Sequence, residues 1–231
     1  RYGCPYQCSF CYNAIFLKDI YKGKGNYLRN KTVARVFQEI KDVQKTSNVK
    51  RIHFHDDNFN FNKEWLEEFC DSYPKEIGIP WSCTVRVDII TEPVVKMMHD
   101  AGCVGVTTGI ETHNERIRND VLNKGLTNED FERASKLFKK YNIKHTTAMM
   151  LNLPGESFED AFKTLKYIRK LKVFSVRSGV FVISKKQPII QMLFEKKYID
   201  KVPEINNFKQ AKLKEVALPT SDIKRLIRLS P

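Results

Sequence analysis

Several features of membrane and secreted proteins are missing from this sequence. No apolar run approaches the roughly 18 residues that a membrane-spanning helix needs. The best candidate, residues 173–183, is interrupted by Arg177. No low-complexity tract occurs. The first residues do not form a charged region followed by an apolar region, as a secretion signal would, because a cysteine cluster stands there. We therefore expect a soluble, cytoplasmic, globular chain without a membrane span.

The cysteines do not follow the pattern of a disulfide framework, which is typical of short secreted chains. Three of the six cysteines are clustered, whereas Cys70, Cys83 and Cys103 stand alone in apolar surroundings. An isolated cysteine in such surroundings usually behaves as a small buried hydrophobic residue. We expect these three in the core of a protein kept in a reducing compartment.

Acidic residues are scarce beside basic ones: 27 Asp and Glu stand against 40 Lys and Arg, giving a net charge of +13. Such an excess can indicate nucleic acid or another anionic substrate. It can equally be a lysine-rich solvated surface. No aromatic-plus-basic motif of the known RNA-binding modules is present. We favour the solvated surface and keep nucleic acid as a less favoured partner.

The 231 residues fit one sizeable domain, with or without a short appendage. Strand-like and helix-like stretches alternate along most of the chain, which predicts a parallel sheet with right-handed crossovers. Strands are expected at residues 50–55, 81–87, 103–110, 143–151 and 173–183. Helices are expected at 33–43, 62–73, from 91, after 112–114, and at 127–141, 157–170, 187–198 and 222–229.

Polar residues gather where these strands end. An Asp56–Asp57 turn, Arg86, Glu111 and the stretch 152–156 all occupy such positions, where ligands collect in parallel sheets. Two strands also carry a polar face, formed by His53, His55, Ser82, Thr84 and Arg86. A flat sheet covered on both sides would be apolar on both faces. The pattern favours a sheet curled around a substrate cavity, with a solvent-exposed sheet face as the alternative.

The densest chemistry is the spacing C-x3-C-x2-C formed by Cys4, Cys8 and Cys11. A structural zinc site needs four protein ligands, normally in two separated pairs, and no second pair or histidine cluster completes one. A 4Fe–4S cluster has four irons, so three cysteines leave one iron open to chelate a cofactor and pass it an electron. The three thiols are therefore candidate ligands of such a cluster.

This loop resembles the defining motif of the radical S-adenosylmethionine superfamily, and similar motifs follow it to about residue 185. The resemblance implies a 4Fe–4S cluster and S-adenosylmethionine, whose reductive cleavage gives a 5′-deoxyadenosyl radical that abstracts hydrogen from the substrate. It also implies an external electron donor such as flavodoxin or ferredoxin, and a small-molecule substrate. The implied fold is α/β, a partial (βα)6 TIM-like barrel.

The same resemblance assigns cofactor-binding roles. Phe10 would pack near the adenine. Asp57 is favoured to hold the methionyl amino group, with Asp56 as the second choice. Arg86 would pair with the cofactor carboxylate, which matches its charge. Glu111 would contact the ribose or amino group, and Pro154–Gly155 would lie near the adenine. Each has an ordinary alternative, such as a surface salt bridge for Arg86 or a favourable acid at a helix start for Glu111.

No catalytic residue is assigned, and Tyr12, Cys83 and Cys103 are hydrogen-donor candidates by residue type alone.

The residues that make up these motifs are most similar to those of the cobalamin-dependent radical enzymes, many of which are methyltransferases or ring-forming enzymes. Those carry a cobalamin-binding domain before the radical domain. The chain begins three residues before Cys4, so we expect a fragment without that domain and without most of the first strand. Residues 1–185 would be the radical core, and 186–231 a partly helical, incomplete extension.

Two other functions are weighed. A methylthiotransferase-like, RNA-modifying radical enzyme would suit the positive charge, but residues 186–231 do not resemble the RNA-binding module such enzymes usually carry. A non-catalytic zinc or nucleic-acid binding module would explain the cysteines and the charge. It would leave Arg86, Glu111 and the 153–156 loop without a role.

Overall fold

The computed structural model describes residues 2–15, 20–183 and 187–199. Its centre is one sheet of five strands in chain order, and every neighbouring pair is parallel. The strands are β1 (Ile52–Phe54), β2 (Trp81–Thr84), β3 (Cys103–Glu111), β4 (Lys144–Leu151) and β5 (Ser175–Val180). The predicted parallel α/β fold is confirmed: the sheet curls into a half-barrel.

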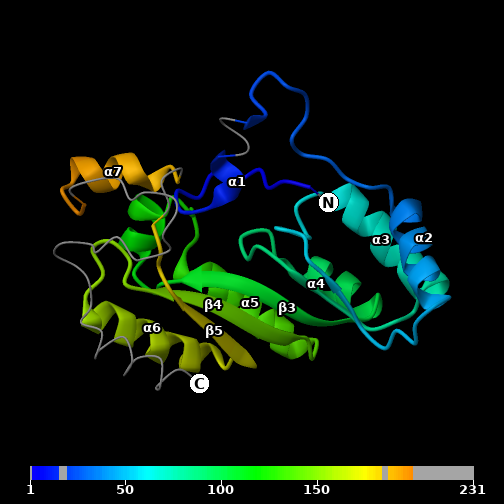
Figure 1. Cartoon of the computed structure of the whole chain (residues 1–231). Helices are drawn as coiled ribbons and strands as arrows, with labels where there is room; N and C mark the ends of the chain where they lie inside the picture. The colour runs from blue at the N-terminus through cyan, green and yellow to red at the C-terminus, as the bar shows by residue number, and fades with distance from the viewer. Residues whose placement is uncertain (1, 16–19, 184–186, 200–231) are drawn as a thin grey trace.

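Helices connect the strands and pack on one face of the sheet (Figure 1). Alternate strand residues, among them Trp81, Cys83, Val106 and Met149, meet helix residues such as Phe69 in one core. The helices in chain order are α1 (Tyr12–Ile15), α2 (Val33–Gln44), α3 (Lys63–Glu76), α4 (Glu92–Asp100), the π-helix η2 (Ile117–Val121), α5 (Asn128–Lys140), α6 (Phe158–Leu171) and α7 (Ile189–Glu195). Within the described ranges, no helix is both long and apolar enough to cross a membrane.

The helices begin where short polar side chains can cap them. Asn62 accepts a hydrogen bond from the Trp65 backbone N–H at 2.8 Å, which starts α3 as expected. Thr127 and Ser157 each form a reciprocal capping box, with Asp130 and Asp160 respectively.

The strand predicted at residues 81–87 ends at Thr84. Beyond it, the Asn60 side chain takes the backbone hydrogen bonds of Arg86 that a neighbouring strand would otherwise take. The amide of Asn60 accepts from the Arg86 backbone N–H and donates to the Arg86 carbonyl, both at 3.0 Å. Arg86 thus leaves the sheet with its backbone hydrogen bonds satisfied, at the edge where β2 opens into the cavity described below.

The helix predicted after residues 112–114 is only the five-residue η2. The guanidinium of Arg118, fully buried, donates to the carbonyls of Ile110, Thr112 and Leu126 at 2.6 to 3.2 Å. These bonds tie the segment to the end of β3. The predicted strands 50–55 and 173–183 and the helix 187–198 are shorter in the structure, and the helix predicted at 222–229 lies outside the described residues.

Two hydrophobic clusters hold the fold. The larger lies between sheet and helices and contains Cys70, Cys83 and Cys103, so the prediction that these cysteines are core residues is confirmed. The smaller joins η2, the loop after β4 and α7, and Phe10 of the cysteine loop packs against it. This second cluster brings chain segments distant in sequence under the cysteine loop.

Candidate active site

The cysteine loop runs from Tyr2 to α1 across the carboxyl ends of the strands. Its backbone is fixed from several sides: the Ser9 N–H and hydroxyl donate to the carbonyls of Leu122 and Val121 at 2.9 and 2.6 Å. Gln187 donates to the Phe10 carbonyl at 2.8 Å, and the Ile189 N–H donates to the Ser9 carbonyl at 3.0 Å. The end of η2, Gln187 and the start of α7 therefore hold the loop in place, and α7 lies close to α1 in Figure 1.

The three thiols of this loop converge on one space. Cys4, Cys8 and Cys11 all line a cavity of about 270 Å³ between the loop and the strand ends. Burial raises the pKa of Cys4 to about 11, and the neighbouring Cys11 and Cys8 add to the rise. Burial also raises the pKa of Cys8, against the opposing charges of Lys124 and Arg86. Among the described residues, no three His, Cys, Asp or Glu side chains have the finished geometry of a metal site.

Arg86 forms the cationic wall of this cavity. Its Nε donates to both carboxylate oxygens of Asp88 at 3.2 and 3.1 Å, and its Nη2 donates to the Lys124 carbonyl at 2.7 Å. The guanidinium carbon lies 3.6 Å from the centre of the Tyr6 ring, a cation–π contact that orients the group. Arg86 lines the cavity, so its guanidinium can offer N–H donors to a bound carboxylate.

Glu111 lines the same cavity and is the last residue of β3. Its backbone φ is +60°, a left-handed conformation uncommon for a residue other than glycine. Lys124 donates to Glu111 Oε1 at 2.5 Å, and the two side chains are only 10% and 9% exposed. A side chain on Gly109 would place its Cβ 2.2 Å from Glu111 Oε1 and 2.7 Å from Lys124 Nζ. The glycine thus makes room for the ion pair inside the cavity.

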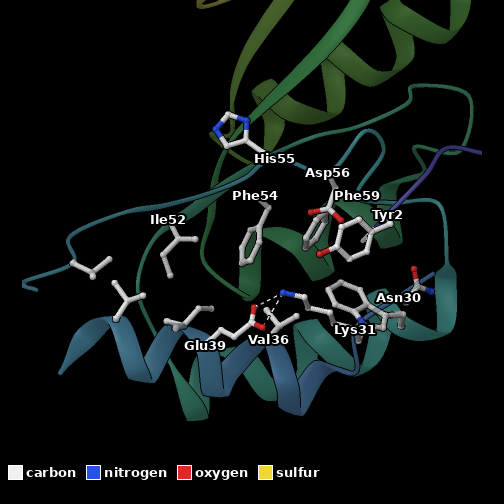
Figure 2. A pocket seen from close by; sticks show the side chains of 14 residues that line it. Tyr2, Asn30, Lys31, Val36, Glu39, Ile52, Phe54, His55, Asp56 and Phe59 are labelled. Carbon is white, nitrogen blue, oxygen red and sulfur yellow. Dashed lines mark hydrogen bonds and ion pairs between the residues drawn. The ribbon is translucent and has the colours of Figure 1, made fainter. Parts of the chain in front are cut away.

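The adjacent carboxylates Asp56 and Asp57 face different spaces. Asp57 lines the cavity of the cysteines, and its charge raises the pKa of Cys4. Asp56 lines a larger, mostly apolar cavity of about 460 Å³ between β1 and α2, together with Ile52, Phe54 and Trp65 (Figure 2). No cysteine lines that larger cavity, so its size does not make it the active site.

Of the remaining predicted residues, Phe10 lines the cavity of the cysteines and Pro154–Gly155 does not. Phe10 lines the cysteine cavity, and Lys124 Nζ lies 5.8 Å from the centre of its ring. Pro154 and Gly155 follow β4 at the same end of the sheet but do not line that cavity. Gly155, with φ +78°, instead lies beside Tyr198 and Arg116, where an added Cβ would come within 3.3 and 3.5 Å of their polar atoms.

Sequence patterns gave no sign of several cavity residues. Tyr6 stands out in the sequence only as part of the cysteine motif, and Lys124 lies in a loop without a recognisable pattern. Asn13, Thr84 and Thr107 also line the cavity. The alternation along β2 was the one available signal, because it placed Thr84 on the same face as Arg86.

The residues present fit an iron–sulfur cluster with a second, zwitterionic ligand. Three thiols from one loop reach the cavity, and the cations Lys124 and Arg86 act on Cys8 in the direction that favours its thiolate. The cations Arg86 and Lys124 and the carboxylates Asp57 and Glu111 all line this cavity and offer partners for both charges of an amino acid group.

Known proteins resemble this chain in sequence or in fold. An uncharacterized methyltransferase of Pyrococcus horikoshii is 30% identical over 172 residues, covering 74% of this chain and 36% of the relative. The anaerobic magnesium-protoporphyrin IX monomethyl ester cyclase of Rubrivivax gelatinosus is 28% identical over 170 residues, covering 72% and 29%. The structure of the radical S-adenosylmethionine methyltransferase TsrM from Kitasatospora setae, with cobalamin and a [4Fe-4S] cluster bound, superposes with a TM-score of 0.71 at 18% identity, covering 84% and 38%.

The chain spans about a third of the length of these relatives. The likeness to TsrM shows the fold, and the curated relatives agree with the similarity to methyltransferases and ring-forming enzymes expected from the motifs. The description that matches residues 2–168 is the Radical SAM superfamily. That range includes the cysteine loop and most of the half-barrel, and the chain belongs to this superfamily.

Proposed function

We propose that this chain binds a 4Fe–4S cluster through Cys4, Cys8 and Cys11 and cleaves S-adenosylmethionine reductively. The observation that carries the proposal is that three thiols from one loop share a cavity with Arg86 and the Glu111–Lys124 pair. Bound there, the cluster and S-adenosylmethionine would supply a carbon radical able to remove hydrogen from a substrate.

The protein's own groups have separate tasks in this proposal. Arg86, held by Asp88 and Tyr6, binds the carboxylate of the cofactor through its guanidinium. Asp57 binds the amino group, a role for which its place beside Cys4 suits it better than the place of Asp56. Glu111 accepts hydrogen bonds from the ribose, and Phe10 gives the adenine an apolar surface. Pro154–Gly155 would lie near the adenine, behind the residues that line the cavity.

The parent protein is proposed to be a cobalamin-dependent methyltransferase, with ring formation as the second candidate. The names of the two curated relatives support these candidates in that order. Its cobalamin would be bound by a domain outside this chain, and its substrate would be a small molecule. Flavodoxin or ferredoxin would supply the electron, in the reducing cytoplasm that the free thiols suit. We keep residues 1–185 as the radical core and 186–231 as an extension.

The proposal is tested by anaerobic reconstitution, reduction with dithionite and assay of 5′-deoxyadenosine formed from S-adenosylmethionine. The wild type is expected to form it, whereas Cys8→Ala should lose at least about 99% of the product because the cluster loses a ligand. Cys70→Ala is the matched control, since that thiol lies in the core away from the cavity. Equal activity in wild type and Cys8→Ala, or a colourless zinc protein, would refute the proposal.

A further inference from the structure

The inner face of the half-barrel carries polar side chains that the cofactor site does not use. His53 Nδ1 lies 2.9 Å from Ser82 Oγ, and the rings of His53 and His55 meet edge to face at 4.4 Å. Near the opposite edge of the sheet, on β4 and β5, Thr146 Oγ1 lies 2.8 Å from Ser175 Oγ. These residues lie below the cofactor cavity, toward the start of the strands.

Strand geometry places these residues on one surface. Figure 2 shows Ile52 and Phe54 pointing toward α2, while His55 points to the opposite side of β1. His53 alternates with Ile52 and Phe54, so it shares the side of His55. Across the sheet, a Cβ on Gly105 would lie 3.6 Å from Ser82 Cβ and 3.9 Å from Lys144 Cβ.

This surface is continuous with the cavity of the cysteines. Thr84, Thr107 and Ala148 line that cavity. Thr84 follows Ser82 on the same face of β2, and Ala148 is the register partner of Arg177 on β5. A molecule in the cavity can therefore extend along the inner face without crossing the sheet.

The charge of this surface is one-sided. Glu111 is the only carboxylate in the five described strands, and Lys124 already neutralises it. Lys144 and Arg177 both stand on the inner face. Arg177 is exposed, and no residue in the described part of the chain forms an ion pair with it.

The first and last strands act on one another across this space. Burial lowers the pKa of His53, and the charges of His55 and then Arg177 lower it further. His53 on β1 and Arg177 on β5 stand near the two edges of the same inner face. A neutral His53 bonded to Ser82 can donate or accept a hydrogen bond, and Arg177 supplies the full charge.

We propose that this inner face binds an anionic group of the substrate, a carboxylate or a phosphate, with Arg177 as its ion-pair partner and His53 and Ser82 as hydrogen-bonding partners. The inference rests on the proposed function, because it assumes that the substrate enters the cavity of the radical chemistry. The anionic group would hold one end of the substrate on the inner face beside Arg177 and leave the other end beside the cofactor.

The test uses the reconstituted 231-residue chain and two probes, inorganic phosphate and succinate, with uncharged succinamide as the matched neutral molecule. Binding is measured by isothermal titration. At least one anion should bind and succinamide should not. Arg177→Gln should weaken binding by about tenfold or more, since it removes a charge-assisted bidentate contact. Arg177→Lys should keep most of the affinity and shows that the site still folds.

Arg169→Gln is the control for net charge, because Arg169 is exposed in the last turn of α6, on the outer helical layer. It should leave anion binding within about twofold. Equal weakening by Arg169→Gln and Arg177→Gln, or no binding of either anion to the wild type, would overturn the inference. Arg177→Gln should still form 5′-deoxyadenosine, so the loss of anion binding is separated from a failure of the cofactor chemistry.

Discussion

Glu111 and Lys124 form an ion pair that is almost closed to solvent at the end of β3. Removing one partner of such a pair leaves an uncompensated charge, which costs more than the pair contributes. We therefore expect Lys124→Met to lower the free energy of unfolding by about 3 kcal/mol. Urea unfolding of the cluster-free chain measures the change.

Lys96→Met is the matched control, because Lys96 pairs with Asp100 on the exposed surface of α4. Solvent screens that pair, so its loss should scarcely change stability. Equal effects of the two substitutions would show that Glu111 does not depend on Lys124 for its charge.

Glu156 lies in the loop after β4 and is 1% exposed. Burial raises its pKa from 4.5 to about 8, against hydrogen bonds from the backbone of Leu153 and Asn152. Between these values the folded chain keeps a proton that the unfolded chain releases. The stabilisation from this group is therefore complete below about pH 4.5 and is lost as the pH rises toward 8.

His145 has the opposite effect at lower pH. Burial lowers its pKa from 6.5 to about 4, so its stabilisation is complete above pH 6.5 and is lost as the pH falls toward 4. The contribution of Glu156 is therefore best measured between pH 6.5 and 8. There the wild type should lose about 2 kcal/mol of unfolding free energy, and Glu156→Gln should lose much less. Two results would contradict this account. One is a pH dependence of the unfolding free energy in Glu156→Gln that equals that of the wild type. The other is an equal reduction of that pH dependence in the exposed control Glu159→Gln.

At the scale of elements, helix caps offer a comparison within one chain. Thr127 caps α5 through a reciprocal box with Asp130, whereas the side chain of Thr91 makes no capping bond at the start of α4. Thr127→Ala should therefore destabilise the chain by about 1 kcal/mol, and Thr91→Ala by clearly less. Thermal unfolding of both variants decides the point. A larger loss at Thr91 would mean that the cap bonds do not set these helix ends.

The elements themselves followed from the sequence more readily than their ends did. Apolar periodicity and capping residues such as Asn62 sufficed for the helices and the parallel order. Strand ends depended on contacts far along the chain, which no local pattern contains. The Asn60 side chain ends β2 by taking the backbone bonds of Arg86, and the buried Arg118 limits the helix after β3 to one short turn.

The site was predictable where chemistry demands a residue type at a fixed spacing. Cys4, Cys8 and Cys11 met that condition, and strand alternation placed Arg86 in the cavity. Lys124 did not, because only the fold carries it from a loop to Glu111. Asp56 and Asp57 were indistinguishable by residue type, and the turn after β1 sends them to different cavities.

At the scale of the molecule, the six cysteines fall into two sets. Cys4, Cys8 and Cys11 share one cavity, and Cys70, Cys83 and Cys103 are buried in the core between sheet and helices. Only the first set can hold a cluster without unpacking the core, since the second lies among closely packed aromatic and aliphatic side chains.

The most direct measurement is therefore the iron and sulfide content of the reconstituted wild type and of six Cys→Ala variants, with circular dichroism as the folding control. The wild type should bind about four irons per chain. Alanine at Cys4, Cys8 or Cys11 should abolish most of that iron, and alanine at Cys70, Cys83 or Cys103 should leave it in place. Full iron in folded Cys8→Ala, or its loss from folded Cys83→Ala, would contradict the account.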